Sequence, residues 1–247
     1  MRYYKGYIAI SDERDIPALL HIRNARAVTF DQLCGLLAYD NLESVRRSVH
    51  WRVSRLAKAK LIERFELERL YGQPVYAITT LGLTLLESRG HSLVALPSTV
   101  ERVIHRTQLF HAVELVHIRL ALAQHGILRS WQSDMEVRSR NLVTAHSYAK
   151  DYDAVVEVNL AGESRKFAIE YERTAKGSAR YEEIREVLSR DKTVDTILYL
   201  LAVELRGVAK RIGIALCDQF RRDTLNTRTL VVGAGAEVVE FRSLIAL

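Results

Sequence analysis

Apolar residues in the first third of the chain recur at α-helical spacing, in short runs that each follow a residue type that caps helices. Asp15 precedes the first run and predicts a helix that begins at the next residue. Thr29 with Gln32, and Asp40 with Glu43, have the spacing of two capping boxes and predict two further helices. The first expected helix begins at residue 16, the second covers residues 30–37, and the third ends near residue 60.

A β-hairpin is predicted directly after the third helix. Residues 63–68 alternate as a strand, a turn follows, and residues 75–78 return. Thr79 or Thr80 then caps a last short helix. Short capped helices joined by a tight turn, followed by a hairpin wing and a helix, have the order of a winged helix-turn-helix domain, which we expect over residues 1–97.

The third predicted helix is basic away from its apolar stripe. Such a face suits phosphate contacts and, near the N-terminal half of the helix, base edges in the major groove of double-stranded DNA. A solvated helix face with Trp51 as a packing residue at its rim is the other interpretation. At the hairpin tip, two residues either contact the DNA backbone or minor groove, or simply form a polar tip. The candidate DNA-binding residues are Arg46, Arg47, His50, Trp51, Arg55 and Lys58 on the helix, and Arg69 and Tyr71 on the tip.

A long helix is predicted in the middle of the chain. Ser98 can cap it and Gly126 can end it. Its apolar residues lie on more than one side, which is typical of a connector packed between domains or of a dimer surface. We therefore expect a connector helix over residues 98–126, and a homodimer is one arrangement that would use its surface.

From residue 127 the pattern changes to short, partly β-branched strands around helices. Strands and helices mixed in this way indicate an α/β domain with one central mixed sheet. We expect this domain over residues 127–247, so the whole chain combines an α+β front with an α/β back.

Three carboxylates are brought together by a predicted hairpin in this second domain. If Ala161–Gly162 is a two-residue turn, Asp153 lies directly across from Glu170. If the turn is Gly162–Glu163, Asp153 faces Glu172 instead. Because cross-strand partners share a side and side chains alternate with a period of two, all three carboxylates project from one face in either register.

Like charges placed opposite one another destabilise a hairpin, so we expect another group to compensate the repulsion among these carboxylates. A hard divalent cation, Mg²⁺ or Mn²⁺, is one, because it takes a few carboxylates and completes its shell with water and phosphate oxygens. Such a metal could activate water at a scissile phosphate, with Glu136 as a further support. An exposed salt-bridge network with Lys150, Arg165 or Arg173 is the alternative.

Charge and composition narrow the class of protein. The chain has 36 Lys and Arg against 30 Asp and Glu, and the whole excess lies in the first 147 residues, which suits a nucleic-acid-facing front. Two cysteines exclude a disulfide scaffold. With no long apolar run and no signal-peptide pattern, we expect a soluble cytoplasmic protein that does not enter a membrane.

Two segments of the second domain resemble the core of the PD-(D/E)XK nuclease superfamily, also called restriction-endonuclease-like. These are Y-D-A-V-V-E-V and, after a short hairpin, F-A-I-E-Y-E-R-T. The winged helix, the connector and this core, taken in order, resemble the replication-relaxation family of plasmid and mobile-element proteins. The resemblance covers roughly residues 15–203.

The resemblance implies a set of site residues. Asp153 matches the first metal-binding carboxylate, Glu170 the second, and Glu136 the acidic residue that often precedes them. Glu172 stands where the motif has Lys, as in some restriction endonucleases with this fold that use Glu there. The implied catalytic residues are Asp153, Glu170 and Glu172, the implied metal ligands Asp153, Glu170 and Glu136, and the cations that could replace the Lys are Lys176 and Arg173.

Two functions are compatible with this reading. The first is a DNA-binding protein of a plasmid or mobile element whose nuclease-like domain cleaves or nicks DNA with a divalent metal. The second is a non-catalytic winged-helix regulator of transcription or plasmid replication, which uses the nuclease-like domain for dimerisation or DNA contact. The retained carboxylates favour the first, and Glu172 in the Lys position favours the second.

Overall fold

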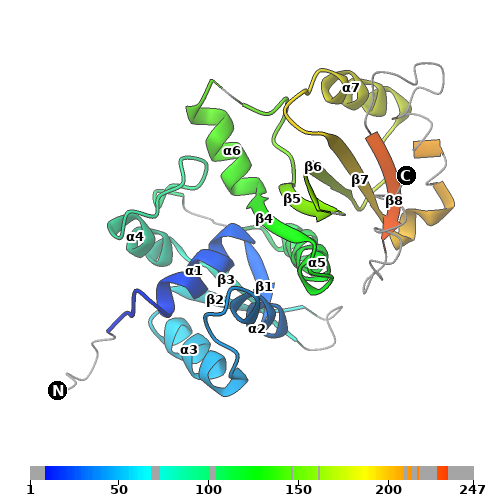
Figure 1. Cartoon of the computed structure of the whole chain (residues 1–247). Helices are drawn as coiled ribbons and strands as arrows, with labels where there is room; N and C mark the ends of the chain where they lie inside the picture. The colour runs from blue at the N-terminus through cyan, green and yellow to red at the C-terminus, as the bar shows by residue number, and fades with distance from the viewer. Residues whose placement is uncertain are drawn as a thin grey trace. The chain divides into compact units, whose positions relative to one another are not determined.

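The computed structural model describes residues 9–67, 73–100, 104–145, 147–160, 162–208, 211–212, 216 and 227–232. It shows a mixed α/β protein (Figure 1). The chain divides into two compact units, Met1–Val116 and His117–Leu247. No helix in the described ranges is long and apolar enough to cross a membrane.

The first unit places its helices around a small antiparallel sheet. Within its described residues the sheet has three strands in the order β1-β3-β2. Leu19, Leu33 and Leu56, one from each of the first three helices, are completely buried. The elements are α1 (Asp15–Asn24), β1 (Ala27–Thr29), α2 (Phe30–Tyr39), α3 (Arg46–Lys58), β2 (Ile62–Glu66), β3 (Pro74–Ile78) and α4 (Thr80–Ser88).

Two of the expected helix caps are confirmed. The Thr29 hydroxyl accepts from the Gln32 N–H at 3.2 Å, and the Gln32 side chain accepts from the Thr29 N–H at 3.0 Å, so the capping box opens α2 as expected. Thr79 caps α4 by accepting from the Gly82 N–H at 3.1 Å. Strands β2 and β3 form the expected hairpin, and the short strand β1 was not predicted.

Two other expected caps are wrong, because their carboxylates have different partners. Asp15 is the first residue of α1 rather than its cap, and it is fully buried in ion pairs. Asp40 pairs with His21 at 2.9 Å, and Glu43 accepts from the Val45 N–H. Helix α3 therefore begins at Arg46 without a side-chain cap.

The long middle helix is shorter than expected. Helix α5 covers Arg106–Gln124 and runs across the division between the two units. Ser98 does not cap it, because its N–H and hydroxyl both donate to the carboxylate of Glu87.

The second unit is built on one mixed sheet. Within its described residues the sheet has five strands in the order β4-β5-β6-β7-β8. The pairs among β4, β5 and β6 are antiparallel, and those of β6 with β7 and β7 with β8 are parallel. The elements are β4 (Leu128–Ser133), α6 (Asp134–Val143), β5 (Ala154–Leu160), β6 (Glu163–Glu172), α7 (Ser178–Ser189), β7 (Thr196–Ala202), the 3-10 helix η2 (Val203–Val208) and β8 (Thr227–Val232).

The β5–β6 hairpin adopts the first of the two expected registers. Leu160 pairs with Glu163 and Ala154 with Ile169, so two positions separate the paired strands. Gly162 has a φ of +93°, a conformation that side chains with a Cβ rarely adopt. This register puts Asp153, the residue before β5, opposite Glu170.

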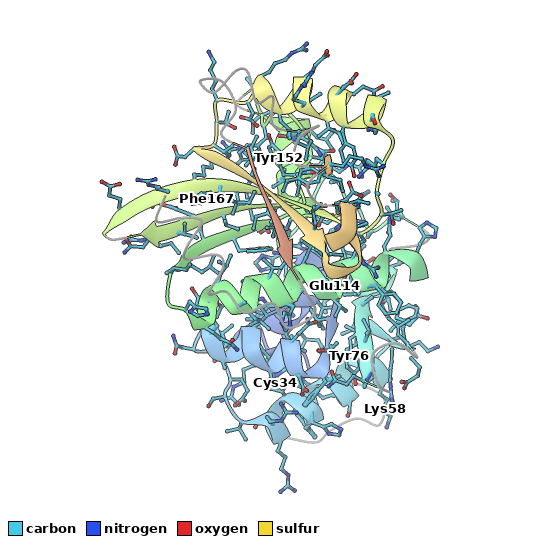
Figure 2. The ribbon with its side chains drawn as sticks, turned by 90° about the vertical axis from the view of Figure 1, so that its right-hand side faces the viewer. Cys34, Lys58, Tyr76, Glu114, Tyr152 and Phe167 are labelled. Atoms are coloured by element: carbon cyan, nitrogen blue, oxygen red, sulfur yellow. The ribbon has the colours of Figure 1, made fainter. Side chains whose placement is uncertain are left out.

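Helix α7 packs on the face of the sheet to which these carboxylates belong. Its buried residues Tyr181, Ile184 and Leu188 join one core cluster with Val155 and Ala168 of the hairpin. Tyr152, fully buried in the same cluster, lies beneath α7 (Figure 2). The acidic side chains are therefore set at the rim of a hydrophobic core.

Candidate functional site

Helix α3 presents a cationic face to solvent. Its apolar residues Val49, Val53 and Leu56 are buried, and it contains no Asp or Glu. Trp51 on the opposite side is 62% exposed. The exposed candidates on this face are Arg46, Arg47, His50, Trp51 and Lys58, the last of which is labelled in Figure 2.

Arg55, which the sequence placed on the same face, is turned toward the protein. It forms an ion pair with buried Asp15, donates to the carbonyl of Ala9 at 2.7 Å, and stacks 4.8 Å from the Trp51 ring centroid. Arg52 also pairs with Asp15, at 2.8 Å. Through these contacts Arg55 fixes α3 against the rest of the first unit, and its guanidinium is directed to Asp15 and Ala9 rather than to solvent.

Asp15 is charged at neutral pH despite its burial. Burial acts to raise the pKa of its carboxyl, but hydrogen bonds from Arg55, the Ser11 N–H and Arg52 outweigh it and lower the pKa below the ordinary value. The sequence contained no signal for this pairing, because the residues are about forty positions apart. Arg69 and Tyr71, predicted at the hairpin tip, lie outside the described residues.

In the second unit, Asp153 and Glu170 form a close acidic pair across the hairpin. The Asp153 carboxylate accepts from the backbone N–H of Tyr171 at 2.7 Å. Glu170 accepts from the Lys150 ammonium at 2.6 Å through one oxygen, Oε2. Its other oxygen, Oε1, is buried and has no hydrogen-bond partner among the described residues.

The environment of Glu170 changes its pKa. Burial and the neighbouring Asp153 raise the pKa to about 7, while Lys150 and Lys176 act in the opposite direction. The pKa of Lys176 is lowered, chiefly by burial, with Lys150 as a like charge nearby. Two carboxylates and two ammonium groups therefore interact electrically in one small region.

Glu172 is held apart from this pair by its own partners. Its carboxylate accepts from Lys176 and, at 2.7 Å, from the buried hydroxyl of Tyr199. Lys176 thus supplies a cation near the strand, as the sequence suggested, and pairs with Glu172. Glu172 acts in this arrangement as an anchor for Lys176.

Glu136 belongs to a helix cap. It lies in the first turn of α6, where its carboxylate accepts from the Ser133 N–H at 2.8 Å and from the Ser133 hydroxyl at 2.7 Å. Across the described part of the chain, no three His, Cys, Asp or Glu side chains are grouped to hold a metal ion. The expected set of Asp153, Glu170 and Glu136 is therefore not assembled, because Glu136 is bound to Ser133.

The remaining pair still suits a hard cation. Mg²⁺ is commonly bound through one or two carboxylates, with water and phosphate oxygens completing its shell. Glu170 offers a buried oxygen without a donor, next to the carboxylate of Asp153. A buried acceptor of this kind is stabilised by any cation or proton that reaches it.

The model of the replication-relaxation family matches residues 19–193 of the chain, more than half of its length. The chain belongs to the replication-relaxation family. The matched segment includes α3 and both members of the Asp153–Glu170 pair. No curated protein and no solved structure matches the chain significantly.

Three residues of these regions were not identified as site residues from the sequence. The local sequence does not mark Asp15 or Tyr199 as a partner of a distant charged residue. Asp15 has the position expected of a helix cap, and Tyr199 lies within a buried strand. Lys150 precedes Asp153 by three positions and was expected to pair with Asp153 or Glu172, whereas it pairs with Glu170.

Proposed function

We propose that this replication-relaxation protein is a DNA-binding protein of a plasmid or mobile element, and that its first unit is a winged helix which inserts α3 into the major groove. The observation that carries the proposal is the exposed face of α3, which is cationic and free of carboxylates within the helix. The +6 net charge of the chain supports the same conclusion.

The order of elements in the first unit supports a winged helix. Helices α2 and α3 follow one another with a short link, and the β2–β3 hairpin comes directly after α3. In helix-turn-helix proteins the second helix of such a pair is the one that reads base edges, chiefly with its N-terminal residues. Arg46 and Arg47 occupy these positions on α3.

A binding measurement tests the proposal. We expect the wild type to bind a labelled duplex of mixed sequence, and the double variant R47A/K58A to bind at least tenfold more weakly with a salt slope reduced by about two. The double variant R14A/R89A removes two exposed charges of the same unit that do not belong to α3 and is the matched control. Equal weakening by both variants would remove the role of α3.

A second function, metal-dependent cleavage of DNA, is favoured by one observation in the second unit. The buried Glu170 Oε1 lacks a partner next to Asp153. Asp153 and Glu170 would hold a divalent cation, and such a cation activates water and stabilises charge at a scissile phosphate. The order of β5, β6, α7 and β7 supports the resemblance to PD-(D/E)XK nucleases.

Residues of the chain would assist this chemistry without touching the metal. Lys150 holds Glu170 in position through one oxygen. Lys176, fixed by Glu172, carries positive charge beside the same pair and would attract a phosphate. The ammonium that the usual motif places on β6 is supplied here by residues outside that strand.

Thermal unfolding and a plasmid assay separate the catalytic and non-catalytic alternatives. We expect millimolar Mg²⁺ or Mn²⁺ to raise the Tm of the wild type, and D153N and E170Q to abolish the increase, whereas E182Q on the exposed face of α7 retains it. Nicking of supercoiled plasmid should follow the same pattern. Without metal stabilisation or nicking, the second unit is a non-catalytic module for DNA contact or dimerisation.

A further inference from the structure

One exposed arginine of α3 is held in a fixed orientation by the rest of the first unit. Arg46 has a side chain that is 62% exposed, yet its Nη2 donates to the Asp31 carboxylate at 2.6 Å. Its guanidinium also lies 5.1 Å from the centroid of the Phe30 ring. Arg47 and Lys58 on the same face make no comparable contact with the described residues.

Asp31 receives hydrogen bonds from two different elements. It lies in the first turn of α2, and its second oxygen accepts from the side-chain amide of Gln73 at 3.3 Å. Gln73 directly precedes β3, so Asp31 links the N-terminus of α3 to the hairpin. The Phe30 ring in turn contacts the His50 ring edge-on at 5.9 Å, which adds a second contact one turn further along α3.

Stability gives little reason for this arrangement. Exposed ion pairs contribute little to stability, because solvent screens them. A carboxylate beside a helix that enters the major groove also repels the DNA phosphates and therefore weakens binding. An acidic residue at this position is explained if it directs the arginine.

The hydrogen bond to Asp31 leaves other N–H donors of the Arg46 guanidinium available to contact a base. A guanidinium has five N–H donors, and the described residues engage Nη2 of Arg46. The remaining donors match the O6 and N7 acceptors of guanine, which arginine contacts as a pair in the major groove. Fixing the side chain before binding reduces the conformational entropy that recognition would otherwise cost.

We propose that Asp31 is a positioning residue that orients Arg46 to read a guanine, while the exposed charges of Arg47 and Lys58 contact phosphates. The proposal rests on the DNA-binding function proposed above. It predicts that Asp31 has opposite effects on two quantities. It lowers the affinity for DNA of any sequence and raises the preference for one base over the others.

The test is selection from a randomised duplex library, with sequencing of the bound fraction. We expect the wild type to prefer guanine at one position or at its symmetric counterparts, and D31A and R46A to reduce that preference about tenfold. On a duplex of mixed sequence, D31A should bind as tightly as the wild type or more tightly, because it removes a negative charge. D31E, which keeps the acceptor, should retain most of the preference.

E63Q is the matched control, because Glu63 is an exposed carboxylate of strand β2 in the same unit, outside α3 and its contacts with Asp31. It should raise affinity for mixed sequence and leave base preference unchanged. Unaltered guanine preference in D31A, or an equal loss in E63Q, overturns the positioning role. A wild type that binds duplexes with no base preference also overturns it, whereas a wild type that binds no duplex refutes the DNA-binding function itself.

Discussion

The ammonium of Lys150 lies 2.6 Å from the carboxylate of Glu170, and this pair sets the electrostatics of the acidic site. Lys150 precedes β5 and Glu170 lies within β6, so the contact closes the open end of the hairpin. Because the Glu170 side chain is only 11% exposed, the nearby lysine is one of the few groups that favour its charged form.

Replacing Lys150 by Met should destabilise the protein more at high pH than at low pH. At pH 8 Glu170 is ionised, and removing its partner leaves a buried charge at a cost of about 3 kcal/mol. At pH 5 Glu170 is protonated, because its pKa is raised to about 7, and the loss should be much smaller. Urea unfolding at the two pH values measures the difference; equal losses would contradict a charged partner.

Glu170 itself should make the wild type less stable as pH rises. Its folded pKa of about 7 is above the ordinary value of 4.5, so the folded state binds the proton more tightly than the unfolded state. Stability associated with this group is therefore present below about pH 4.5 and is lost as pH rises through 7, by about 3 kcal/mol. E170Q should flatten this part of the stability profile, and a divalent cation bound at Glu170 should do the same.

Tyr199→Phe should remove a specific hydrogen bond from the site. The hydroxyl donates to the largely buried Glu172 carboxylate, and hydrogen bonds to charged groups contribute about 1.5–3 kcal/mol. Tyr76→Phe is the control, since this buried tyrosine of β3 makes no hydroxyl bond to the described residues. If both variants unfold at the same urea concentration as the wild type, the Tyr199–Glu172 bond does not contribute to stability.

Asp15→Ala should have one of the largest effects of any polar substitution in the first unit. It leaves Arg52, whose side chain is 4% exposed, without its main counter-ion and also releases Arg55. Breaking a buried pair in this way costs about 3–5 kcal/mol. Asp12→Ala breaks the exposed pair with Arg89 and should cost less than about 1 kcal/mol. Thermal unfolding of the two variants tests the contrast.

Gly82→Ala should destabilise α4, although alanine is the better helix former by about 1 kcal/mol. A Cβ on Gly82 would clash with the carbonyl oxygen of Leu61, a backbone atom that cannot move aside cheaply. Thr84→Ala, on the exposed side of the same helix, should be close to neutral. A Tm for Gly82→Ala at or above that of the wild type would contradict this close approach.

Local patterns in the sequence predicted local structure well. The Thr29 capping box and the first-unit hairpin depend on residues close in the chain and are confirmed. The structure selects Thr79 over Thr80 as the cap of α4, and the first of the two expected β5–β6 registers. The Ser133–Glu136 capping box is local as well, and it holds the Glu136 carboxylate that the family resemblance assigned to a metal.

Partners distant in sequence were not predictable in the same way. Asp15 resembles a helix cap until α3 supplies Arg52 and Arg55 from about forty residues away. Tyr199 can donate to Glu172 because β7 lies parallel to β6, where the cross-strand partner of Tyr199 is Glu170, two residues before Glu172. Such contacts follow from tertiary packing, which overrides what a residue would do beside its sequence neighbours.

The register of the β5–β6 hairpin has a consequence for how this family can change during evolution. Insertion or deletion of one residue within β5 or β6 would turn the side chains beyond it to the opposite face and separate Asp153 from Glu170. Extra residues at the tip leave the strand pairing intact. Relatives that retain the acidic pair should therefore differ in length at the tip of this hairpin and preserve the number of residues along its two arms.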